Sequence, residues 1–171
     1  MVESAHKYNR MVAVGSQRVS SVLYAKAKEI YDSGKLGEVF SINAYWDRNS
    51  PSGAWVYPIP PDANEKTIDW NTFLGGAPKV PFDTVRFFRW RCYWDYSGGQ
   101  QTNFGAHHLD IAQWGLGTDD GGPVGVEGSA TFNKDKWFET PETAKITYTY
   151  ANGANVICTL GKGGFPGGAT F

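Results

Sequence analysis

Residues 98–110 are the most informative part of the sequence, and they read Gly98-Gly99-Gln100-Gln101-Thr102-Asn103-Phe104-Gly105-Ala106-His107-His108-Leu109-Asp110. The glycines allow the backbone to turn sharply and to approach a ligand closely. Apolar and polar residues then alternate at helical spacing over residues 106–116, which predicts a helix. The stretch therefore brings two histidines, an amide and a carboxylate to the first turns of one helix, and a loop that leads into a helix is a common place for chemistry.

Composition and charge limit the possible folds and partners. The chain has 171 residues, of which 41% are hydrophobic, enough for one globular domain with a real core. Its 16 basic and 17 acidic residues leave a net charge of −1, so no global field favours nucleic acid or an anionic membrane. No apolar run is long enough to span a bilayer and the first residues are not a signal peptide, so we expect a soluble chain, cytoplasmic or periplasmic.

Hydrophobic patterns place the elements of the first half. The apolar run 11–14 has the size of a buried strand, and residues 20–33 form an amphipathic helix whose apolar positions are Leu23, Ala27, Ile30 and Tyr31. A strand is predicted over residues 39–48. Its proposed buried face consists of Phe40, Ile42, Ala44 and Trp46. Residues 49–66 contain four prolines and are predicted to form a long ordered loop.

The second half has the pattern of an antiparallel sheet. Asp69 is expected to cap a short helix over residues 70–74. Residues 124–132 alternate as a half-buried strand, and residues 144–150 and 154–160 flank Asn152-Gly153, a dipeptide that favours a type I′ hairpin turn. The fold class is therefore α+β.

Aromatic residues make up 15% of the chain, and many lie between residues 46 and 96. Core burial explains such density in part, because aromatic side chains dominate apolar burial. A pocket for a sugar is the sharper explanation, because flat aromatic faces stack on a pyranose while polar neighbours bind its hydroxyls. The candidates for stacking are Trp46, Trp55, Tyr57, Trp90, Tyr93, Trp94 and Tyr96.

Several motifs occur in the order typical of one enzyme family. They are Val14-Gly15-Ser16-Gln17-Arg18, Ser33-Gly34-Lys35-Leu36-Gly37, Asp69-Trp70 with Phe73-Leu74-Gly75, Arg89-Trp90-Arg91-Cys92-Tyr93-Trp94-Asp95-Tyr96-Ser97-Gly98-Gly99, and residues 103–117. Over most of its length the chain resembles the Gfo/Idh/MocA oxidoreductases, the family of glucose-fructose oxidoreductase and inositol dehydrogenase. The resemblance implies an N-terminal Rossmann domain for NAD or NADP, and a C-terminal open-faced, largely antiparallel sheet with helices on one face that holds the polyol and forms homo-oligomers.

The resemblance also implies how this chain is divided. Residues 1–17 correspond to the last helix and strand of a truncated Rossmann domain, with cofactor contacts assigned to Gln17 and Arg18. Residues 18–171 correspond to the substrate-binding and oligomerisation domain, and both ends of the chain look cut. No Gly-x-Gly-x-x-Gly follows a strand and opens a helix, so we expect the chain by itself not to bind NAD or NADP.

In inositol-dehydrogenase-like members an Asp and a His four residues later face the substrate hydroxyls. Those positions are Asn103 and His107 here, and the resemblance makes them the catalytic candidates. The ordinary pKa of histidine, ~6.5, suits His107 to exchange a proton, whereas Asn103 can only orient the substrate. His107 carries the proton alone, or together with the lysine of the family's Glu-Lys-Pro motif, which these 171 residues do not contain. The candidates for substrate binding are Asp110, His108, Arg89, Arg91, Tyr93, Tyr96 and Trp94.

Structural roles compete with these assignments. Asn103 can serve as a helix N-cap, and His107 can be bonded to Asp110 in a packed interface. His108 is expected to point elsewhere. Arg89 and Arg91 would lie on one side of an extended segment, where ion pairs with Asp83, Asp95 or Asp110 are the simpler expectation. No metal is predicted, because the histidines and Asp110 lack a further ligand nearby in the sequence.

Two functions remain from this evidence. The first is the substrate-binding part of an NAD(P)-dependent oxidoreductase that acts on a secondary hydroxyl or ketone of a sugar or cyclitol. The second is a non-catalytic carbohydrate-binding or oligomerisation module. We also expect a homo-oligomer, because an open-faced sheet leaves one broad face in need of cover.

Overall fold

The computed structural model describes residues 1–46, 56–135, 137–161 and 167–171. The chain divides into two compact units, Met1–Leu36 and Gly37–Phe171. The predicted sugar-stacking residue Trp55, the first part of the loop predicted over residues 49–66, and residues 162–166 of the C-terminal glycine-rich segment lie outside the described residues.

The first unit contains two helices, α1 (Val2–Lys7) and α2 (Val22–Asp32). The helix predicted over residues 20–33 is confirmed, and the chain leaves it through Gly34, whose φ is +72°. Neither helix has a buried residue, so the predicted apolar face of α2, with Leu23 75% exposed, is not a core face here. The strand predicted over residues 11–14 is wrong, because these residues are irregular and exposed and no described strand hydrogen-bonds to them.

The second unit is built on a five-stranded sheet of order β2-β3-β4-β1-β5. The strands are β1 (Ser41–Trp46), β2 (Gly125–Phe132), β3 (Pro141–Thr149), β4 (Asn155–Leu160) and β5 (Gly168–Thr170). Strands β1 and β4 pair in parallel, and the other three pairs are antiparallel. The predicted α+β fold with an open, largely antiparallel sheet is therefore confirmed. The predicted hairpin is confirmed, since β3 and β4 pair antiparallel. The predicted type I′ turn is wrong, because Gly153 has a positive φ, +86°, and Asn152 does not.

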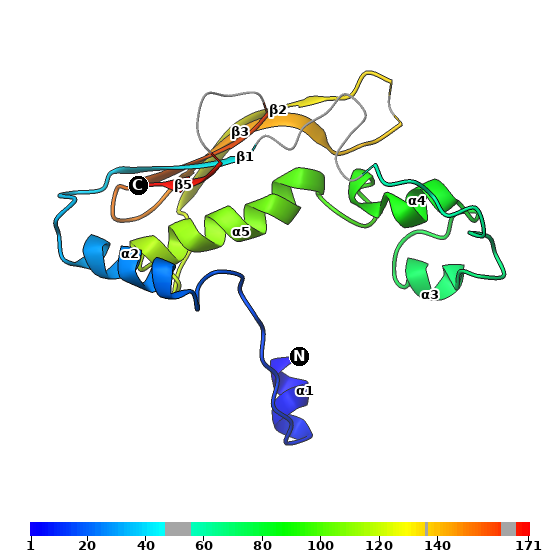
Figure 1. Ribbon diagram of the computed structural model, residues 1–171, viewed down its shortest axis with the longest axis horizontal. Coiled ribbons are helices and arrows are strands. Elements are labelled where there is room, and N and C mark those ends of the chain that lie inside the picture. Colours follow the sequence, from blue (N-terminus) through cyan, green and yellow to red (C-terminus); the bar gives the residue numbers. More distant parts are fainter. Residues whose placement is uncertain (47–55, 136, 162–166) are drawn as a thin grey trace. The chain divides into compact units, whose positions relative to one another are not determined.

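A single long helix, α5 (Gly99–Leu116), runs along one face of the sheet (Figure 1). The main hydrophobic core lies between them. The α5 side of the core consists of Phe104, Leu109, Ala112 and Leu116. The sheet side consists of even-numbered residues of β1, β3 and β4: Ile42, Ala44, Trp46, Ala144, Ile146, Tyr148, Val156, Cys158 and Leu160. Three of the four residues predicted for the buried face of β1 are in this core. Phe40 is 75% exposed, because β1 begins only at Ser41.

The opposite face of the sheet is left open by α5. Because side chains alternate along a strand, this face carries the odd-numbered residues. Most of them are polar: Ser41, Asn43, Tyr45, Glu127, Ser129, Thr131, Thr143, Lys145, Thr147, Thr149, Asn155, Ile157 and Thr159. The sheet is thus amphipathic, and only the face toward α5 has the composition of a core.

Three short helical segments precede α5: α3 (Trp70–Leu74), α4 (Thr84–Phe88) and the 3₁₀ helix η1 (Trp90–Cys92). The Asp69 side chain caps α3 as predicted, accepting a hydrogen bond from the Thr72 backbone N–H. The Asp83 carboxylate caps α4 in the same way. The expectation that Arg89 and Arg91 lie on one side of an extended segment is wrong, because residues 90–92 form the 3₁₀ helix η1.

Candidate functional site

The helix that carries the candidate site is longer than its sequence pattern predicts. The structure starts α5 at Gly99, whose φ of +69° favours glycine, and a Cβ at this position would lie 2.5 Å from Thr140 Cβ. Gly98 is the N-cap. The alternative role of Asn103 as N-cap is therefore wrong, because Asn103 lies inside the helix, one turn after its start.

Three of the predicted site residues share one face of α5. Asn103, His107 and Asp110 follow one another at helical spacing, and all three are half-buried. By helical phase this face points away from the side of α5 that packs on the sheet. The His107 ring lies 6.2 Å from the Phe104 ring, centroid to centroid, in an edge-on contact. The face presents an amide, an imidazole and a carboxylate in a row.

His108 lies on the other side of the helix and belongs to the core. The side chain is 9% exposed, and its ring stacks on the Trp46 indole with centroids 5.6 Å apart and planes 15° apart. The Phe104 ring is also nearly parallel to the His108 ring, with centroids 6.4 Å apart. These ring contacts give His108 a packing role in the space between helix and sheet.

The remaining predicted substrate-binding residues lie before α5, around a second hydrophobic cluster of Cys92, Tyr93 and Phe138. Tyr93 is 8% exposed, whereas Trp94 is 53% exposed and keeps an aromatic face accessible. The Arg91 guanidinium lies 4.2 Å above the Trp90 ring, and the Arg89 guanidinium lies 5.6 Å from the Trp137 ring. Both arginines thus pack on tryptophans.

Of the carboxylates expected to pair with Arg89 or Arg91, Asp95 pairs with Arg86. Arg86 Nη1 lies 2.8 Å from Asp95 Oδ2, and Arg86 Nη2 lies 3.7 Å from Glu139 Oε1. The guanidinium also covers the Tyr93 ring at 4.5 Å. Burial alone would lower the pKa of Arg86, but Tyr96 and the two carboxylates raise it above its ordinary value. Sequence reasoning missed this residue because nothing in its local pattern separates it from the other two arginines.

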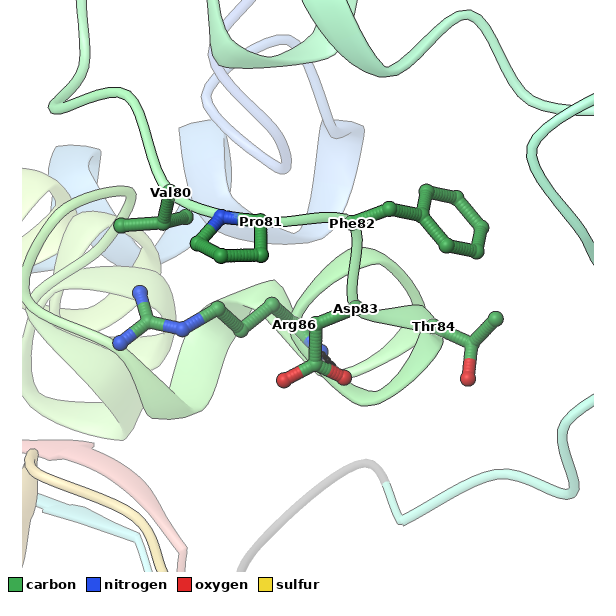
Figure 2. A pocket seen from close by; sticks show the side chains of 6 residues that line it. All are labelled: Val80, Pro81, Phe82, Asp83, Thr84 and Arg86. Carbon is green, nitrogen blue, oxygen red and sulfur yellow. Dashed lines mark hydrogen bonds between the residues drawn. The ribbon is translucent and has the colours of Figure 1, made fainter.

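An open hollow of about 540 Å³ lies beside this cluster, lined by Val80, Pro81, Phe82, Asp83, Thr84 and Arg86. Figure 2 shows that the Arg86 side chain and the Phe82 ring extend in opposite directions from it. Its charged groups are already engaged, since Asp83 accepts hydrogen bonds from two backbone N–H groups of α4 and Arg86 is ion-paired. A ligand in this hollow would therefore compete with contacts that Asp83 and Arg86 already make.

The predicted cofactor-binding residues lie in the first unit. Gln17 and Arg18 occupy an exposed turn, in which Arg18 has a φ of +80° and donates a hydrogen bond to the Tyr24 hydroxyl at 3.1 Å. Among the described residues, no group of three or more His, Cys, Asp or Glu side chains is arranged to hold a metal ion. None of the helices in the described part of the chain combines the length and apolar composition needed to cross a bilayer.

Comparison with known proteins agrees with this architecture. Residues 29–164 match a family model described as the C-terminal alpha/beta domain of an oxidoreductase family. None of the curated proteins is similar enough in sequence to match the chain.

Solved structures with the same fold are much longer than this chain. GenD2 from gentamicin A biosynthesis, in complex with NAD, is 18% identical with a TM-score of 0.59, over 98% of this chain and 37% of its own. The WlbA dehydrogenase from Chromobacterium violaceum, in complex with NADH and UDP-GlcNAcA, is 16% identical with a TM-score of 0.56, over 97% of this chain and 38% of its own. An NAD-binding protein from Listeria innocua is 18% identical with a TM-score of 0.56, over 96% of this chain and 37% of its own. The chain thus spans less than two fifths of each of these proteins.

Proposed function

The chain belongs to the Gfo/Idh/MocA family of oxidoreductases and carries its C-terminal alpha/beta domain, and from this we propose that it is the substrate-binding part of an NAD(P)-dependent dehydrogenase. The proposed reaction is the oxidation of a secondary hydroxyl of a sugar or cyclitol to a ketone, or its reverse. The observation that carries the proposal is the row of Asn103, His107 and Asp110 on the face of α5 that points away from the sheet.

His107 is the proposed acid and base. The His107 side chain is half-buried, and an imidazole is the side chain that most often serves as a general acid or base in enzymes. In the oxidation, a ring nitrogen of His107 accepts the hydroxyl proton while the carbon loses a hydride. Asn103, one helical turn earlier, donates or accepts a hydrogen bond and so orients the substrate without exchanging a proton.

The residues of this chain act on the hydroxyl side of the reaction. A nicotinamide dinucleotide, when bound, accepts the hydride. The glycines that open α5 follow a 3₁₀ helix and a turn, whereas the element that binds a pyrophosphate follows a strand. The described residues therefore do not fit the phosphates, and Gln17 and Arg18 remain the proposed cofactor contacts.

A sugar is the substrate class that the aromatic residues favour. Trp94 and Tyr57 are 53% and 51% exposed, as stacking residues must be, and the WlbA complex contains a sugar nucleotide. Arg89, Arg91, Tyr93 and Tyr96 are proposed to line the substrate side of the same region. The division into residues 1–17 and 18–171 and association through the open face of the sheet also remain predictions.

The test is an assay of the complete protein with NAD or NADP and a panel of sugars, sugar nucleotides and cyclitols. We expect substrate-dependent reduction of the nicotinamide with at least one of them. The variant Asn103→Asp gives a more specific test. It places a second proton acceptor one turn from His107, which should shift the pH profile of turnover without abolishing turnover. Saturable sugar binding without any nicotinamide reduction would favour the non-catalytic binding module.

A further inference from the structure

Glu139 connects two segments that are far apart in the sequence. It lies just before β3, next to Phe138 of the second hydrophobic cluster. Its backbone N–H donates a hydrogen bond of 2.8 Å to the Cys92 carbonyl oxygen. Its carboxylate Oε2 accepts a hydrogen bond of 2.9 Å from the Trp94 backbone N–H. One residue thus holds the chain at both ends of residues 92–94.

The Glu139 carboxylate is held in turn by Arg86. Arg86 Nη2 lies 3.7 Å from Oε1, the other oxygen of the carboxylate. Because each oxygen has its own partner, the carboxylate keeps one orientation. The side chains of Arg86 and Glu139 are 21% and 38% exposed, and an ion pair so close to solvent adds little to stability. Fixing the chain at Trp94 is therefore the larger consequence of this contact.

Trp94 depends on its backbone for its orientation. It is 53% exposed, whereas Tyr93 is 8% exposed and Tyr96 packs on the Phe73 ring with centroids 5.0 Å apart. Packing therefore fixes the two tyrosines more firmly than the tryptophan. Trp94 also lines an open groove of about 370 Å³, together with Gln101 near the start of α5. An aromatic face beside a groove binds a sugar ring best when the chain holds that face at a fixed angle.

We propose that Glu139 is a positioning residue for the sugar substrate. Its carboxylate fixes the backbone at Trp94, and this presents the indole face for stacking on a sugar ring. The inference rests on the proposed function, because it needs a sugar as the substrate. Glu139 acts through Trp94 and takes no proton, since that role is the one proposed for His107. It should therefore affect the affinity for the sugar and leave the chemical step unchanged.

The order of Trp94 can be measured without any ligand. Labelling the complete protein with fluorotryptophan gives fluorine NMR signals for its 7 tryptophans, and Trp94→Phe identifies the signal of Trp94. In Glu139→Ala we expect this signal to narrow and to move toward the shift of free fluorotryptophan, because the exposed ring moves more freely once its backbone is released. The signal of the buried Trp46 should stay in place. An unchanged Trp94 signal in Glu139→Ala would overturn the proposal.

Steady-state kinetics test the effect on the sugar, with the member of the assay panel that gives turnover. Glu139→Ala should raise KM about tenfold and change kcat less than about twofold, because the apparent affinity falls with the fraction of molecules that present the ring. Glu139→Gln keeps an oxygen that accepts from the Trp94 N–H, and it should restore most of the affinity. A fall in kcat as large as the rise in KM would overturn the proposal. Failure of Glu139→Gln to restore affinity would assign the effect to the ion pair with Arg86 and would also overturn it.

Asp95→Asn is the matched control. It removes a carboxylate from the same guanidinium, that of Arg86, and leaves the bond between Glu139 and the Trp94 N–H in place. KM and the Trp94 signal should therefore match those of the parent protein, and the same changes as in Glu139→Ala would overturn the proposal. If no sugar of the panel binds to the parent protein, the proposed function fails and the sugar role of Glu139 fails with it. The fluorine signals would still decide whether Glu139 fixes Trp94.

Discussion

The two sides of α5 have different surroundings although their residues are neighbours in the sequence. His107 and His108 are neighbours, yet His108 is stacked on Trp46 in the core while His107 stands on the outer face with Asn103 and Asp110. Successive residues of an α-helix are rotated by ~100° about its axis. Two adjacent residues at the boundary of the core can therefore lie in different surroundings. The residue type alone therefore does not predict the role of a histidine on this helix. Its position around the helix axis, relative to the sheet, does.

Replacing the outer histidine should have the largest effect. In the complete enzyme, His107→Ala should lower turnover by roughly 100-fold or more, the usual contribution of a general acid or base. Because the side chain is only half-buried, its loss should change the free energy of unfolding by less than about 1 kcal/mol. Steady-state kinetics and a denaturant titration of the same variant measure the two effects. Wild-type turnover with an unchanged pH profile would remove His107 from the mechanism.

Replacing the inner histidine should show the opposite behaviour. His108→Ala removes a buried ring that packs on Trp46 and Phe104, and should lower the free energy of unfolding by on the order of 2–3 kcal/mol. His108→Phe keeps a flat ring of similar size and should recover much of that loss. Urea denaturation followed by tryptophan fluorescence is the measurement. Equal stability of His107→Ala and His108→Ala would erase the distinction between the two sides of the helix.

The core beneath α5 should also respond to alkaline pH. Burial raises the pKa of the Cys158 thiol from its ordinary 9.0 to about 11, although the hydrogen bond from Gln101 lowers it in part. Above about pH 9 the unfolded chain loses this proton while the folded chain keeps it, so the free energy of unfolding falls as the pH rises toward 11. The full shift corresponds to about 3 kcal/mol at ~1.36 kcal/mol per pKa unit, of which about 2 kcal/mol is lost by pH 11.

Cys158→Ala isolates that contribution, because Tyr148, Tyr150 and Cys92, whose pKa values burial also raises, remain in place. Between about pH 8 and pH 11 the variant should lose about 2 kcal/mol less stability than the parent chain. The comparison uses denaturant titrations at each pH. Parallel losses in the two proteins would show that the thiol is not shielded from water.

Two glycines on α5 provide the smallest and most closely matched test of its packing. A Cβ at Gly105 would lie 3.7 Å from Trp46 and Leu109, which is ordinary contact, so Gly105→Ala should raise stability by up to about 1 kcal/mol through helix propensity. A Cβ at Gly115 would overlap the Phe171 ring. Gly115→Ala should therefore lower stability by about 1 kcal/mol, since overpacking outweighs propensity. Thermal melts of the two variants should shift in opposite directions.

Sequence reasoning was most reliable where one local cause decides the structure. The Asp69 cap, the turn at Gly153 and the alternation of β1 are local effects of side-chain hydrogen bonding, glycine conformation and strand period, and the structure shows all three. It failed for residues 11–14, because an apolar run becomes a strand only if another strand supplies its hydrogen bonds. It also did not single out Arg86 as the partner of Asp95, because nothing local distinguishes Arg86 from Arg89 and Arg91.

The sequence by itself determined the fold class, the family and the candidate residues on one helix, because periodicity, turn residues and ordered motifs are properties of the chain alone. Only the tertiary structure decided where α5 begins, which of its two histidines enters the core, and the order of the strands in the sheet. These features depend on how the helix and the strands pack on each other. Contacts between residues far apart in the chain fix that packing, and no window of sequence contains them.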